Sequence, residues 1–197
     1  MPTTQILQFK IVLNDIEPTI WRRIEVPASY TFWDLHVALQ DAMGWLDSHL
    51  HVFQFLLRGG KAIEIGIPDP DNLQEDPTAQ GWTVPVMGIF PLDTPISYLY
   101  DFGDGWSHEV TLEAIAPRRK GVKYPRCVAG ARVCPPEDCG GPHGYQHVLE
   151  VLAKPHGNEY ADMLRWLGGR FDAETFSASQ VRFDDPKERF RRAFEEG

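Results

Sequence analysis

The amino-acid sequence predicts an α+β fold: a mostly antiparallel sheet of hairpins with one helix packed on it, followed by a helical C-terminal part. Two patterns carry this prediction. Short apolar runs typical of strands, separated by turn residues, recur through residues 5–115, whereas residues 145–197 contain three short helical patterns. The chain has 197 residues and 43% hydrophobic composition, enough for a sizeable core. We expect one domain over residues 1–183 and a C-terminal helix over residues 184–197.

The chain is predicted to begin with a hairpin and a helix. Residues 5–14 (QILQFKIVLN) alternate as a strand does, and a DIEP turn connects them to a second strand at residues 19–26. A helix over residues 31–45 follows, because Thr31 can cap its start and Gly44 stands near its end. Its apolar residues recur at helical spacing, at Phe32, Leu35, Leu39 and Met43.

A second hairpin is predicted after this helix. Residues 49–57 are rich in β-branched and aromatic side chains, and residues 61–67 can return after two glycines. Residues 68–81 are acidic, contain proline and lack a period, which indicates an exposed excursion.

The stretch YDFGDGWSHEV belongs to a third hairpin, predicted over residues 96–115 with its turn at Asp104–Gly105. This register places Asp101 opposite His108. Both then lie on a face that is otherwise apolar, with Leu99, Trp106, Val110 and Leu112. Polar groups on such a face need partners, so a structural Asp101–His108 pair is the leading interpretation.

The remaining chain is predicted as a long irregular loop and three helices. Residues 116–144 are rich in proline and glycine. Helices follow at residues 145–155, 159–169 and 185–197, the last with Asp185 as its N-cap.

Composition disfavours several classes of partner. The net charge of −9 disfavours nucleic acid and membrane surfaces. There is no apolar run of 18 residues and no signal-peptide pattern, and three cysteines fit a reducing compartment, so we expect a cytoplasmic protein. The basic run at residues 118–126 is the best nucleic-acid candidate, but it is short, and the acidic run at residues 64–76 could be its partner within the chain.

Aromatic, histidine and acidic residues of the two hairpins and the PPED segment suggest a groove. The leading hypothesis is a binding module for an unknown small molecule, peptide or protein. The alternative is a metal-dependent hydrolase that uses His49, His51, Asp101 and His108, with Glu137 or Asp138 as general base. A solvated turn around His49 and His51 would explain those two residues without any function. The candidate groove residues are Trp45, His49, His51, Asp101, Asp104, Trp106, His108, Glu137 and Asp138.

The loop CVAGARVCPPEDCGGPHG offers a second possible site. Cys127, Cys134, Cys139 and His143 are the residue types that bind structural zinc, although their spacing is not that of a standard knuckle. The same cysteines could instead be small buried thiols. A nucleophilic Cys139 activated by His143 or His147 has less support.

Three blocks of sequence resemble a known family. They are IWRRIEVPASYTFWDLHVALQDAMGWLDSHLHVF, YLYDFGDGWSHEVTLE and YPRCVAGARVCPPEDCGGPHGYQHVLEVL. In order and spacing they resemble the plasmid pRi Orf-three-like family, also known as insertion-element passenger (TnpR-type) proteins, from about Lys10 to Phe183. The resemblance implies an α+β domain and no particular activity. The passenger name suggests a recombinase or another nucleic-acid-associated role. A recombinase would need an activated serine and a DNA-binding helix-turn-helix, and neither pattern occurs in this acidic chain.

Overall fold

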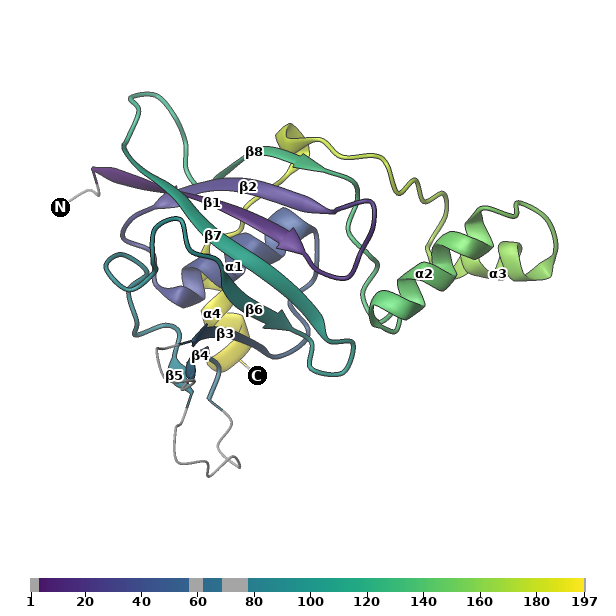
Figure 1. The fold of residues 1–197 in the computed structure, drawn as a ribbon, viewed down its shortest axis with the longest axis horizontal. Helices are drawn as coiled ribbons and strands as arrows, with labels where there is room; N and C mark the ends of the chain where they lie inside the picture. Colours follow the sequence, from purple (N-terminus) through teal and green to yellow (C-terminus); the bar gives the residue numbers. More distant parts are fainter. Residues whose placement is uncertain (1–3, 57–61, 69–77, 197) are drawn as a thin grey trace.

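The computed structural model describes residues 4–56, 62–68 and 78–196. Eight strands form a single sheet in the order β5-β4-β3-β6-β7-β1-β2-β8 (Figure 1). The strands are β1 (Gln5–Leu13), β2 (Trp21–Pro27), β3 (His51–Leu56), β4 (Ala62–Gly66), β5 (Ala79–Gln80), β6 (Ile96–Tyr100), β7 (Trp106–Pro117) and β8 (Arg126–Ala131). The helices are α1 (Phe32–Met43), α2 (Gly141–Leu152), α3 (Asn158–Trp166) and α4 (Pro186–Phe194), with a 3-10 turn η1 (Ala178–Gln180).

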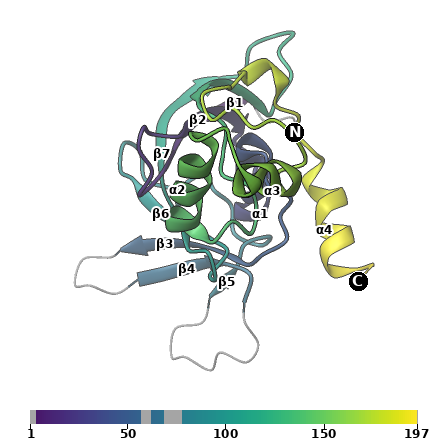
Figure 2. The same cartoon turned by 90° about the vertical axis from the view of Figure 1, so that its right-hand side faces the viewer.

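The sheet curves around α1, which supplies much of the core (Figure 2). The predicted start and end of this helix are confirmed. The Thr31 hydroxyl accepts from the Asp34 backbone N–H, the Asp34 carboxylate accepts from the Thr31 N–H, and Gly44 ends the helix with φ 94°. Apolar residues of α1 pack on the inner face of the sheet, where the alternating strand residues Phe9, Ile11 and Phe53 are buried.

The predicted fold class is corrected by this topology. The strands form one mixed sheet rather than an antiparallel set of hairpins, because Ile65–Gly66 of β4 pair in parallel with β5. The C-terminal helical part is small, with helices of 12, 9 and 9 residues. Most of the predicted excursion at residues 68–81 lies outside the described residues, as does the turn between β3 and β4.

Strand β8 replaces part of the predicted loop at residues 116–144. Its residues pair with β2, so that Gly130 lies opposite Arg22. The glycine is read in the sequence as a turn signal, but its role is close packing. A Cβ at Gly130 would lie 2.8 Å from the Trp21 carbonyl oxygen and 2.5 Å from the Phe176 ring.

The predicted register of the β6–β7 hairpin is wrong. Tyr98, not Asp101, lies opposite His108, and Tyr100 lies opposite Trp106. The turn spans five residues, because Asp101 itself adopts φ 56° and its carbonyl accepts from the Gly105 N–H at 2.6 Å. The longer turn shifts the strand pairing by three residues, an odd number, and therefore turns Tyr98 and Tyr100 inward in place of Leu99.

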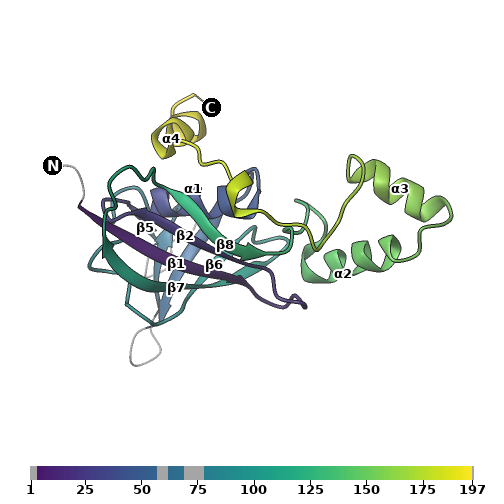
Figure 3. The same ribbon diagram turned by 90° about the horizontal axis from the view of Figure 1, so that it is seen from above.

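The C-terminal helices leave the sheet in two directions. The pair α2 and α3 extends beyond the end of the sheet, whereas α4 lies over α1 (Figures 1 and 3). Helix α4 is held there by Arg189, which lies 2.7 Å from Asp41, and by Phe190 and Phe194, which pack against Trp33. Within the described residues, no helix is long and apolar enough to cross a lipid bilayer.

Candidate functional site

Three loops meet at one end of the sheet and bring a histidine together with three carboxylates. His49 lies between α1 and β3, Asp101 begins the β6–β7 turn, and Glu137 and Asp138 lie between β8 and α2. His49 Nε2 lies 3.0 Å from Asp138 Oδ1, 3.5 Å from Asp101 Oδ2 and 3.7 Å from Glu137 Oε2. We refer to these four residues as the histidine-carboxylate cluster.

Asp101 is held by its own turn. Its Oδ1 accepts hydrogen bonds from the backbone N–H groups of Gly103, at 2.9 Å, and Asp104, at 3.2 Å. These bonds leave Oδ2 directed at His49. The left-handed backbone of Asp101 is uncommon outside glycine, asparagine and aspartate, and such conformations concentrate at functional sites.

Glu137 is fixed by two hydrogen bonds to the other loops. Its Oε1 accepts from the Leu46 N–H at 2.7 Å and from the Tyr100 hydroxyl at 3.1 Å. Burial, together with the charge of Glu137, raises the pKa of Tyr100, so this hydroxyl stays protonated and donates. The carboxylate is therefore oriented before any ligand arrives.

The segment that carries Glu137 and Asp138 is docked on the hairpin turn. Trp45 Nε1 donates to the Pro135 carbonyl at 2.9 Å, and the Gly140 N–H donates to Asp104 Oδ2 at 3.1 Å. A Cβ at Gly141 would lie 2.3 Å from the Asp104 carbonyl oxygen, so only glycine allows this approach. Asp138 also has a left-handed backbone, with φ 55°. Asp104 thus supports the cluster and lies outside it.

The other histidines of the predicted groove lie in the core. The His51 ring stacks on His36 with centroids 3.4 Å apart, and neither of its nitrogens has a hydrogen-bond partner among the described residues. His108 Nδ1 lies 3.2 Å from the Tyr98 carbonyl oxygen. Neither ring belongs to the group of His49, Asp101 and Asp138, whose ligand atoms lie within 4.8 Å of one another. The predicted Asp101–His108 pair is wrong, because His108 lies opposite Tyr98. Trp45 and Trp106 are also buried, and the ring centroids of Trp45 and His108 lie 5.4 Å apart.

The four predicted zinc ligands are not brought together. Cys127 belongs to β8, Cys134 is buried against Met43, and His143 is exposed in the first turn of α2. Among the described residues, the one group of three or more histidines, cysteines and acids with ligand atoms within 4.8 Å of one another is His49, Asp101 and Asp138. Burial raises the pKa of Cys134 to about 11 and that of Cys139 to about 12, so both are protonated thiols at neutral pH.

The geometry of the cluster suits a metal ion. Ligand atoms bound at ~2.1 Å around one tetrahedral ion lie ~3.4 Å apart. The separations of 3.0 and 3.5 Å from His49 to the two aspartates fall close to that value. The Asp138 side chain is 73% exposed, whereas that of Asp101 is 9% exposed, so the cluster opens to solvent on the Asp138 side.

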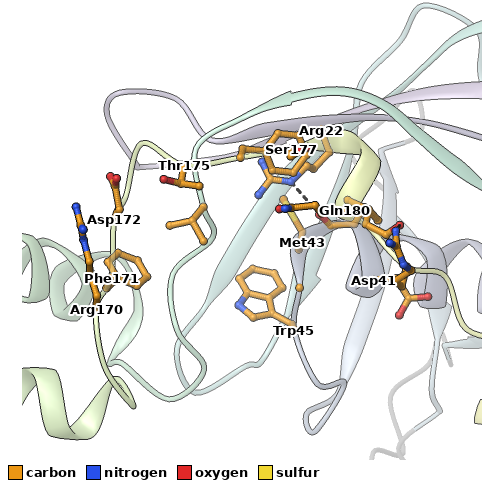
Figure 4. A pocket seen from close by; sticks show the side chains of 16 residues that line it. Arg22, Asp41, Met43, Trp45, Arg170, Phe171, Asp172, Thr175, Ser177 and Gln180 are labelled. Atoms are coloured by element: carbon orange, nitrogen blue, oxygen red, sulfur yellow. Dashed lines mark hydrogen bonds between the residues drawn. The ribbon is translucent and has the colours of Figure 1, made fainter.

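A large pocket lies elsewhere and is lined by only one residue of the predicted groove, Trp45. It has a volume of about 930 Å³ and lies between the C-terminal end of α1 and residues 170–182, which connect α3 to α4. Figure 4 shows Arg22 and Trp45 on opposite sides of this space, which we call the linker pocket. Sequence reasoning missed Arg22, although its place in the alternation of TIWRRIEV puts it on the apolar face with Ile20 and Ile24.

Comparison with known proteins gives consistent results. A family model described as plasmid pRiA4b ORF-3-like protein matches residues 5–180. An uncharacterized protein of Sinorhizobium fredii is 36% identical over 180 residues, covering 89% of this chain and 88% of that protein. The crystal structure of a protein of unknown function from Methanosarcina mazei Go1 shares 42% sequence identity with a TM-score of 0.81, covering 91% of this chain and 99% of that one.

Proposed function

The chain belongs to the plasmid pRiA4b ORF-3-like family, and from this premise we propose that it is a binding module that holds one divalent transition-metal ion in the histidine-carboxylate cluster. The observation that carries the proposal is the convergence of His49, Asp101 and Asp138 from three separate loops. Residues this far apart in sequence meet only in the folded protein.

The donor set indicates the kind of ion. One imidazole nitrogen with carboxylate oxygens suits zinc, manganese or iron(II) better than calcium or magnesium, which prefer oxygen ligands alone. Asp101 and Glu137 are oriented by backbone and hydroxyl donors, which is the support that metal ligands usually receive. The open side at Asp138 leaves room for a small molecule or a peptide group to complete the coordination.

The test is titration of the purified chain, stripped with a chelator, with Zn²⁺ and Mn²⁺ in a calorimeter. We expect one ion per chain. His49→Ala should weaken binding at least about tenfold, because loss of even a residue that supports a metal ligand typically costs that much. Asp101→Asn should also weaken binding but keep the fold, because the amide oxygen can still accept from Gly103. His156→Ala, at an exposed histidine far along the chain, is the matched control. Binding that survives both substitutions would contradict the proposal.

A metal-dependent hydrolase is the second candidate, in a form without His51 and His108. The observation that favours it is Glu137, which lies beside His49, accepts a hydrogen bond from Tyr100 and would act as the general base. Metal-loaded protein would be assayed on p-nitrophenyl acetate and bis-p-nitrophenyl phosphate. A hydrolase should lose turnover in Glu137→Gln while it keeps metal affinity. Absence of turnover in the loaded protein leaves the binding module as the function.

We also propose that the protein works in a reducing compartment, as expected for the cytoplasm. Its three cysteines are free thiols, and Cys134 is buried in the core.

A further inference from the structure

Arg22 is a buried cation without a carboxylate partner. It is 1% exposed, and its Nε donates to the Ala42 carbonyl oxygen at 2.8 Å. Nη1 donates to the carbonyl oxygens of Trp21, at 2.8 Å, and Ala131, at 2.9 Å. Nη2 donates one weak hydrogen bond, of 3.6 Å, to Cys134 Sγ. A guanidinium has five N–H donors, so within the described part of the chain one Nη2 donor and the positive charge are left over.

The other buried arginine, Arg132, has a carboxylate partner. Arg132 is 7% exposed and forms a salt bridge of 2.8 Å with Glu174. Burying an ion without a counter-charge is costly, and the cost falls when an opposite charge arrives. Burial lowers the pKa of Arg22, and no described carboxylate opposes this effect. Arg22 therefore lacks the carboxylate partner that Arg132 has.

Arg22 lines the linker pocket, where the charge balance favours an anion. Arg170 and Arg182 also line this pocket. Of its two acids, Asp41 is already paired with Arg189, at 2.7 Å, and Asp172 is solvent-exposed. The result is a positive site in a chain whose net charge is −9.

The walls of the linker pocket indicate the body of the ligand. Met43, Trp45 and Phe171 supply apolar and aromatic surface, and the ring of Phe176 lies 3.9 Å from the Arg22 guanidinium carbon. Thr175 and Gln180 add neutral polar groups, and Gln180 lies between Arg22 and Trp45 in Figure 4. A volume of about 930 Å³ is within the range of small-molecule sites.

We propose that the linker pocket binds a small organic anion, a carboxylate or phosphate carried on an apolar or aromatic body, with Arg22 as its buried anchor. The anionic oxygen accepts from Nη2 of Arg22, Arg170 and Arg182 attract it at the solvent side, and the ligand body packs against Trp45 and Phe171. This site is separate from the histidine-carboxylate cluster and does not depend on a metal ion.

Calorimetric titration with phenyl phosphate and benzoate tests the proposal, with benzyl alcohol and benzylamine as the neutral and cationic analogues. We expect saturable binding of at least one anion and weaker or no binding of the two analogues. Tighter binding of phenyl phosphate than of benzoate would assign a phosphate ligand, and the reverse a carboxylate. Equal binding of benzyl alcohol and the anions, or no binding of either anion, would overturn the proposal.

Variants at the solvent side keep the test independent of folding. Arg170→Ala combined with Arg182→Ala removes two exposed charges and should weaken anion binding by about tenfold, the value of one charge-assisted hydrogen bond. Arg165→Ala, an exposed arginine of α3 outside the pocket, is the matched control. Arg22→Met should abolish binding if it folds. Unchanged affinity in the double variant contradicts the site, whereas binding that persists in His49→Ala separates it from the metal proposal.

Discussion

His51 and His108 make the stability of the protein depend on pH. Both rings are buried and have a nitrogen without a partner among the described residues. Burial lowers the pKa of His108 to about 4, and burial together with His36 lowers the pKa of His51 well below its ordinary value. As the pH falls, these two histidines therefore take up protons in the unfolded chain at a higher pH than in the folded protein. The stabilisation is complete above the unfolded pKa of about 6.5 and is lost as the pH falls below it.

The expected loss from His108 alone is about 3 kcal/mol between pH 6.5 and 4. Urea unfolding of the wild type at several pH values in this range measures it. The variant His108→Gln should have lower stability at pH 7 but a shallower fall toward acid pH. If the free energy of unfolding falls equally steeply with pH in the wild type and the variant, groups other than His108 cause the pH dependence.

Asp101 and His108 should act independently, in contrast to the sequence-based expectation of a pair. Asp101→Ala removes two hydrogen bonds to backbone N–H groups and places alanine at positive φ, which should cost about 1–2 kcal/mol. Because His108 lies opposite Tyr98, the double variant with His108→Ala should lose the sum of the two single losses. Chemical unfolding of all four proteins measures this, and a loss well below the sum would restore the pair.

At the scale of elements, Gly144 determines how α2 starts. A Cβ there would lie 1.8 Å from the Cys139 carbonyl oxygen. This clash is with backbone, so it can be relieved only if the backbone itself moves. Gly144→Ala should therefore displace the segment that carries Glu137 and Asp138, lower the melting temperature by several degrees and weaken metal binding. Gln146→Ala, exposed on the same helix, controls for helix content. A normal melting temperature for Gly144→Ala would mean that the helix start shifts freely.

Helix α4 should be a removable addition. The family match ends at residue 180, and α4 has no buried residue. A chain ending at residue 183 should fold and keep its metal affinity. It should melt at a lower temperature and show red-shifted tryptophan fluorescence, because Trp33 loses Phe190, Phe194 and its hydrogen bond to the Pro186 carbonyl. Phe190→Ala should give a smaller shift in the same direction. Loss of all structure on truncation would make α4 part of the domain.

The sequence predicted α1 well and β8 poorly for one physical reason. Capping signals and helical spacing are local, and Thr31 and Gly44 show both in the chain itself. The pairing of β8 with β2 is a contact between distant segments. Gly130 in β8 makes room for the Phe176 ring and does not form a turn. The same distinction applies to the histidine-carboxylate cluster. Its four residues were candidates by residue type, which is local information. The length of the β6–β7 turn, which keeps His108 out of the cluster, could not be predicted from the sequence.

At the scale of the whole molecule, two of the five positive side chains in the basic run at residues 118–126 are paired within the chain. Arg119 and Arg126 both contact Glu25, each at 2.7 Å. With a net charge of −9, we expect no saturable binding of duplex DNA in fluorescence anisotropy at about 0.15 M salt. Glu25→Gln is the informative variant, since it frees two arginines. Tight, steeply salt-dependent binding by the wild type would favour the mobile-element role.

An open sheet has two outer strands, and each exposes backbone groups that could recruit another chain. Strand β8 is one of them, and residues 173–180 run beside it: the Val133 N–H donates to the Ala173 carbonyl at 3.0 Å, and the Phe176 ring lies over Gly130. The segment that walls the linker pocket therefore also shields this edge from self-association. A proteolytic cut within it would expose the edge, and the nicked protein should aggregate faster than the intact chain.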